Sequence, residues 1–170
     1  VRGVDPAGQI YTPWIPTRAA WNCGTESDTS ASSAKMARQA DGRFLFAQQV
    51  RGPTGLNRLC ISRLNPDATL DAGYGDGGRL RLDDGRFAGA PATIHALALR
   101  RDGGAVMVLE TSSPVAPSLV YLAWLTAGGA LDTSRGTQGI AGPLALPIHG
   151  VQATAFQADD KILLAGYPLT

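Results

Sequence analysis

The sequence predicts an all-β protein built from repeated four-stranded antiparallel units. Three observations predict this fold: 21 glycines and 11 prolines spread over 170 residues, short apolar segments between the turns they mark, and motifs that return about every 60 residues. Frequent Gly and Pro turns between short apolar runs are typical of β structure. No helical periodicity stands out among the apolar residues.

A polar turn centred on aspartate, followed by an apolar segment, occurs three times. The copies are QADGRFLFAQ (Gln39–Gln48), RRDGGAVMVLE (Arg100–Glu110) and QADDKILLAG (Gln157–Gly166), with their aspartates spaced by 61 and 57 residues. A fixed period of this length indicates a repeat architecture.

A second motif has the same period. RLNPDATLDAGYGDGG, from Arg63, aligns with WLTAGGALDTSRGTQG, from Trp124, so that Leu-Asp falls on Leu-Asp and two glycines fall on glycines. A fainter copy, GVDPAGQI (Gly3–Ile10), matches the first eight residues of the motif at Arg63. The repeat therefore covers nearly the whole chain from Ser33 and, more faintly, Val1–Ile10.

One repeat reads as four strands. We predict strand one over Thr93–Arg100, strand two over Ala105–Glu110 and strand three over Leu119–Leu125, with strand four running through the Leu-Asp and Gly-rich stretch. Four antiparallel strands in about 40–60 residues are the signature of a β-propeller blade. In such a blade we expect strand one at the axis and strand four at the rim.

The motifs RLNPDATLDAGYGDGG and QADDKILLAG resemble the delta-60 repeat of bacterial proteins. The resemblance implies a propeller-like array, mostly in secreted or surface-associated bacterial proteins, and brings no catalytic residues with it. The copy from Pro91 departs from the pattern, because Thr126-Ala127-Gly128 replaces Asn-Pro-Asp and Trp124 replaces the arginine.

The termini are out of phase with the repeat. We predict a single repeat domain, with a half blade and polar loop at 1–32, blades at 33–90 and 91–150, and a half blade at 151–170. About three blades' worth is too few for a propeller ring of roughly four to eight blades. We therefore expect strand Lys161–Gly166 to pair with a second copy, with another polypeptide or with a continuation of the chain. The start at Val1 is expected for a mature product, a fragment or the ordered part of something longer.

The segment GYGDGG (Gly73–Gly78) superficially fits a phosphate-binding loop or a calcium loop. A phosphate loop opens a helix, whereas the strand-like RLRL follows here. Nearby aspartates supply oxygens, but the EF-hand spacing and its final Glu are missing. We interpret the segment as a turn of the repeat and predict neither a cofactor nor a metal.

The remaining candidate site residues are few. Cys23 and Cys60 are either two buried thiols or one disulfide of an exported protein. If strand one is innermost, His95 and its counterpart Gln152 lie near the mouth of a central channel. Tryptophan 124 is expected to pack within or between blades.

Composition excludes several function classes. The formal net charge is +1 without any basic or acidic run, which argues against nucleic-acid or anionic-membrane partners. No apolar run approaches the roughly 18 residues of a membrane span. The sequence thus favours a noncatalytic scaffold or binding module, extracellular, periplasmic or at the cell surface. The alternative is one portion of a propeller hydrolase or oxidoreductase with its site in the central channel.

Overall fold

The computed structural model describes residues 3–4, 10–11, 30–51, 57–87, 90–111, 118–157 and 159–168. Within these ranges, every regular element is a β-strand except the short 3₁₀ turn η1 (Asp84–Arg86). The described residues include no helix with the length and hydropathy needed to cross a membrane. The predicted all-β class is confirmed.

The first four-stranded sheet is an antiparallel meander. It contains β3 (Ser30–Arg38), β4 (Phe44–Arg51), β5 (Asn57–Leu64) and β6 (Arg79–Asp83), paired in chain order. Its third and fourth strands are separated by the long Asn-Pro-Asp and Gly-rich stretch. That stretch is a series of tight turns, so the prediction that strand four runs through it is wrong. Strand four begins after the last glycine, where the Arg-Leu alternation suits a half-buried strand.

The second sheet repeats the same path. It contains β7 (Ala92–Leu99), β8 (Ala105–Thr111), β9 (Leu119–Leu125) and β10 (Ile140–Leu144), again paired in chain order. The predicted strand over Leu119–Leu125 is confirmed as β9. The two complete four-stranded units predicted from the repeat are therefore present.

Two two-stranded sheets contain the other described strands. β11 (Ile148–Phe156) pairs with β12 (Ile162–Pro168), and β1 (Gly3–Val4) pairs with β2 (Ile10–Tyr11). β3 begins at Ser30 and β11 at Ile148, each three residues before the predicted boundaries at 33 and 151.

Backbone conformation follows the same spacing as the sequence motifs. Residues with a left-handed φ recur 61 positions apart in the two complete sheets, in the pairs Gly42 and Gly103, Ala68 and Gly129, Gly75 and Gly136, Gly77 and Gln138, and Gly78 and Gly139. Asp160 has the same conformation in the third Asp turn, with φ 65°. The turns are therefore alike even where the residues differ.

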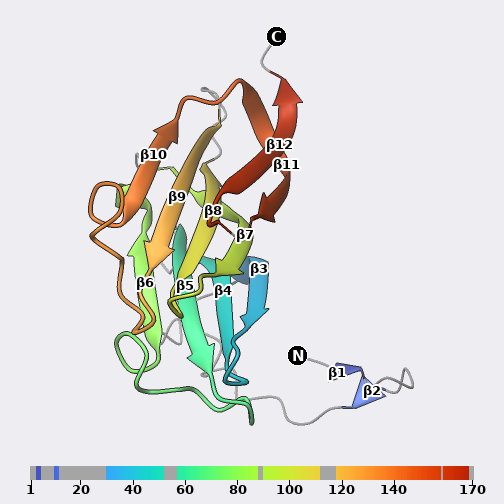
Figure 1. The fold of residues 1–170 in the computed structure, drawn as a ribbon, viewed down its shortest axis with the longest axis vertical. Helices are drawn as coiled ribbons and strands as arrows, with labels where there is room; N and C mark the ends of the chain where they lie inside the picture. The colour runs from blue at the N-terminus through green and yellow to red at the C-terminus, as the bar shows by residue number, and fades with distance from the viewer. Residues whose placement is uncertain are drawn as a thin grey trace.

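The two four-stranded sheets and the β11–β12 sheet pack face to face in chain order (Figure 1). The first strands lie side by side, with β7 in contact with β3 on one side and with β11 on the other. β8 is buried along its whole length because the sheets on both sides cover it. Met107 and Leu109 face the first sheet, and Val108 faces β11 and β12. Each such fully buried side chain stabilises the fold by roughly 1.5–3 kcal/mol.

Candidate binding groove between the two complete sheets

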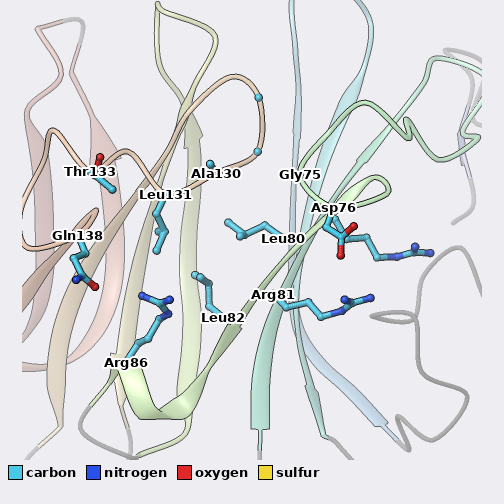
Figure 2. A pocket seen from close by; sticks show the side chains of 13 residues that line it. Gly75, Asp76, Leu80, Arg81, Leu82, Arg86, Ala130, Leu131, Thr133 and Gln138 are labelled. Atoms are coloured by element: carbon cyan, nitrogen blue, oxygen red, sulfur yellow. The ribbon is translucent and has the colours of Figure 1, made fainter.

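A groove of about 910 Å³ lies between β6 and the loop that follows β9. Leu80 and Leu82 of β6 and Leu131 of the loop converge on its interior, as Figure 2 shows. Arg86 and Gln138 border the same space, and Arg81 is directed away from it (Figure 2). The groove thus combines an apolar floor with a polar border.

The alternation of β6 sets this arrangement. In RLRLD, every second side chain is a leucine, and successive side chains of a strand point to opposite faces. Leu82 is fully buried and Leu80 is partly buried, both on the side of the second sheet. The turn η1 then carries Arg86 to the border of the groove.

A close backbone contact closes one end of the groove. The Gly75 N–H donates to the Gly128 carbonyl oxygen at 2.8 Å, and Arg63 Nη1 donates to the Ala127 carbonyl oxygen at 2.8 Å. The Tyr74 ring lies against Gly129, where an added Cβ would be 2.8 Å from ring atoms. These contacts fix the turn of the second sheet on the Gly-rich loop of the first.

Arg63 is held in place by its own sheet. Its Nε donates to Asp71 Oδ2 at 2.7 Å, and its guanidinium carbon lies 4.7 Å from the centre of the Tyr74 ring. Burial raises the pKa of Tyr74 to about 12, against an opposing effect of Arg63. Burial also acts to raise the pKa of Asp71, but the Gly73 N–H and Arg63 outweigh it and lower that pKa. The carboxylate is therefore charged at neutral pH.

A second hollow of about 430 Å³ adjoins the first. Tyr121, Ile140 and Gly142 line it together with Arg86 and Gln138, which also border the main groove. Arg86 is exposed, so its guanidinium is available to a ligand in either hollow. The two hollows therefore share Arg86 and Gln138 on their borders.

The two predicted channel-mouth residues have different surroundings. His95 Nε2 lies 2.9 Å from Glu110 Oε2, whereas the exposed Gln152 side chain donates to the Gly150 carbonyl oxygen at 3.2 Å. Glu110 also accepts the N–H groups of Gly150 at 2.9 Å and of Val151 at 3.0 Å. Glu110 therefore connects β11 to the second sheet, and His95 is the third group that contacts its carboxylate.

The outcomes for the other predicted residues also differ from one another. Cys60 is fully buried on β5, but Cys23 lies outside the described residues, so the disulfide between them stays a prediction. Trp124 borders a small cavity shared with Arg100 of its own sheet and Phe156 of β11, which agrees with a packing role between sheets. In the part of the chain that the structure describes, no cluster of three His, Cys, Asp or Glu side chains is placed to hold a metal.

The sequence did not indicate Arg86 and Gln138 as site residues. They are separated by 52 residues and belong to different repeats, so no local motif joins them. The Arg-Leu alternation of β6 was the available signal for the groove, because it places a row of leucines shortly before Arg86.

Comparison with protein-family models, curated proteins and solved structures gave no match.

Proposed function

We propose that the chain is a noncatalytic β-propeller-type module that binds a ligand in the groove between its two complete sheets. The resemblance to the delta-60 repeat supports an origin in a secreted or surface-associated bacterial protein. The observation that carries the proposal is the groove itself, in which a leucine floor from β6 lies beside the exposed guanidinium of Arg86.

The stacking of the sheets supports the propeller-type architecture. β3, β7 and β11 are the first strands of successive sheets, and each contacts the next. In a propeller, the first strands of successive blades surround the axis. The fourth strands then lie at the rim, which is where β6 contributes to the groove. A binding surface at the rim is open to large ligands.

The chemistry of the groove defines the ligand class. The partly buried Leu80 and Leu131 suit an apolar group, and Arg86 suits a carboxylate, with Gln138 as an additional donor or acceptor. We propose an extended peptide segment with an apolar side chain next to an acidic one.

The enzymatic alternative is less well supported. Its candidate base, His95, is bound to Glu110, and Glu110 in turn accepts two backbone N–H groups of β11. These contacts connect the β7–β10 sheet to the β11–β12 sheet. It gives both side chains a structural role.

The test is binding of a peptide array by the intact chain, by Arg86→Ala and by the matched control Arg101→Ala. Arg101 is also exposed but lies on the turn between β7 and β8, outside the groove. Peptides that pair an apolar with an acidic residue should bind the intact chain and the control equally, and should bind Arg86→Ala about tenfold more weakly. Equal binding by all three proteins would contradict the proposal.

A further inference from the structure

We infer that the second hollow is a carboxylate subsite, in which Arg86, Gln138 and the Tyr121 hydroxyl select an acidic side chain over its neutral amide. The inference rests on the peptide binding proposed above and names the residues that decide which peptides bind. Three features carry it: the residues that line the hollow, the backbone of Gln138 and the bulge opposite Tyr121.

The lining of the second hollow suits a group with a single negative charge. Of the described residues that line it, Arg86 alone is charged, and Thr137 and Gln138 add neutral hydrogen-bonding side chains. Gly85 and Gly142 carry no side chain, which leaves room beside the guanidinium. One guanidinium balances one carboxylate, and the hydrogen bonds between the two groups are charge-assisted. A carboxylate therefore fits the charge and the donors of this hollow.

The backbone of Gln138 is left-handed, with φ 53°. Gly77, which lies 61 residues earlier in the first sheet, has φ 56°, so a glycine serves the same turn there. A long side chain in this conformation costs free energy, and residues held in this way gather at binding sites. The Gln138 side chain is exposed and borders both hollows, so it does not offset this cost by packing in the core. We attribute its presence to ligand binding.

The β9–β10 pair contains a bulge that the first sheet lacks. Gly142 and Pro143 together stand opposite Tyr121, because the pairing shifts there. The corresponding residues of the first sheet, Cys60 and Arg81, face each other in a regular ladder. A bulge redirects nearby side chains and often lies beside a functional site. The shape of the second hollow is thus a feature of the second sheet and not of the repeat.

The bulge places the Tyr121 ring in the wall of the hollow. A Cβ added to Gly142 would lie 2.5 Å from Cδ1 of this ring, and Phe87 packs against it edge to face with the ring centres 5.6 Å apart. Tyr121 is only 3% exposed, so these contacts hold the ring in one position. Burial raises the pKa of Tyr121 above its ordinary value of 10, so the hydroxyl keeps its proton at neutral pH and can donate to a carboxylate oxygen.

Fluorescence anisotropy with two labelled peptides tests the selectivity. Both peptides have blocked termini, and one contains Leu-Glu where the other contains Leu-Gln. The intact chain should bind the Leu-Glu peptide at least about tenfold more tightly, because the amide NH₂ of glutamine would face the Arg86 guanidinium, which has donors only. Equal affinities for the two peptides would overturn the inference.

The variant Tyr121→Phe removes the hydroxyl and keeps the ring that packs against Phe87. It should weaken binding of the Leu-Glu peptide by about threefold to tenfold and leave binding of the Leu-Gln peptide unchanged. A purely structural role of Tyr121 would change both affinities alike. Equal losses for the two peptides, or no loss for either, would contradict the assigned role.

The variant Gln138→Gly gives the second sheet the residue of the first. Because glycine adopts the left-handed conformation without strain, the urea midpoint should rise while the affinity for the Leu-Glu peptide falls. Ala68→Gly is the matched control, since Ala68 has φ 63° in the first sheet and lines neither hollow. The control should also raise the midpoint but should leave peptide binding unchanged. Loss of binding in both variants, or in neither, would overturn the inference.

The subsite and the proposed function fail separately. Equal binding of the two peptides that is still weakened by Arg86→Ala would refute the subsite and leave the proposed binding function intact. Binding of neither peptide by the intact chain, or binding that is insensitive to Arg86→Ala, would refute the proposed function and the subsite with it.

Discussion

Arg100 Nη1 lies 2.8 Å from Asp132 Oδ2, and this ion pair joins the end of β7 to the loop before β10. Asp71 holds the same position in the first sheet, 61 residues earlier, but its nearest arginine is Arg63 at the end of β5, 2.7 Å away, with Arg43 at 3.4 Å. Trp124 stands where a second copy of Arg63 would be. Each sheet thus keeps a carboxylate–arginine pair but takes the arginine from a different strand.

The first prediction concerns Asp71→Asn. The substitution keeps the shape of the side chain but leaves the largely buried Arg63 guanidinium without its countercharge. We expect the free energy of unfolding in urea to fall by about 1–3 kcal/mol. Asp67→Asn is the matched control, because Asp67 is exposed in the same loop and binds only Thr69. Equal losses in both variants would contradict this reading of Arg63.

The second prediction concerns acid. Ser134 and Arg100 lower the pKa of Asp132, and the Gly73 N–H and Arg63, acting against burial, lower that of Asp71, both from an ordinary value of 3.8. A carboxyl group with a lower pKa in the folded state stabilises the fold above its unfolded pKa, and this stabilisation is lost as the pH falls through the folded pKa. We therefore expect stability to decline below about pH 4.

Urea midpoints measured from pH 6 down to pH 2.5 check this dependence. The double variant Asp71→Asn with Asp132→Asn should start from a lower midpoint and show a flatter decline. A midpoint that rises on acidification of the intact chain would show the opposite sign and refute the assignment.

The third prediction concerns the joint at Glu110. Glu110→Ala leaves the N–H groups of Gly150 and Val151 without their acceptor, and each unsatisfied buried group costs about 1–3 kcal/mol. The loss should be local, so hydrogen exchange at Val151 should accelerate more than exchange in β4. Gln152→Ala is the control, since its side chain is exposed on the same strand. Uniform acceleration in all strands would contradict a local joint.

The sequence predicted the sheets well because their signals are local. Leu119–Leu125 is a strand with turn residues on both sides, and the Asp turns at positions 41, 102 and 159 each precede an apolar strand. Strand four was misplaced because the Leu-Asp stretch carries apolar residues, although its glycines adopt left-handed turns before Arg79. Backbone conformation at glycine, not hydrophobicity, decides where that strand begins.

The groove and the joint at Glu110 were not predictable in the same way. Arg86 and Gln138 border the same hollows, and Glu110 binds the Val151 N–H, only because two sheets stack on one another. Stacking distances depend on tertiary packing, which a periodic motif does not encode. The chemical type of each residue was visible in the sequence, but its partner was not.

The fourth prediction concerns the cysteines. We expect Cys23 and Cys60 to form a disulfide, so alkylation without reduction should leave the mass of the intact chain unchanged. Cys23→Ala should then lower the free energy of unfolding by about 2–4 kcal/mol under oxidising conditions. In the presence of reductant, the variant and the intact chain should be equally stable. Two alkylated thiols in the unreduced, denatured chain would refute the bond.

The last prediction separates two glycines that share a left-handed backbone. Gly129 has φ +86°, and a Cβ added there would lie 2.5 Å from the Gly75 backbone nitrogen and 2.8 Å from the Tyr74 ring. Gly77 has φ +56°, and an added Cβ would meet no atom within 4 Å.

Both alanine variants carry the cost of the left-handed conformation, about 1 kcal/mol. Gly129→Ala must also push apart the contact that closes the groove, so we expect it to lower the free energy of unfolding by at least about 2 kcal/mol more than Gly77→Ala does. It should also weaken peptide binding, which Gly77→Ala should leave unchanged. Thermal or urea unfolding of the two variants side by side, with the peptide array, measures the difference, and equal effects would show that the Gly75–Gly128 contact does not hold the sheets together.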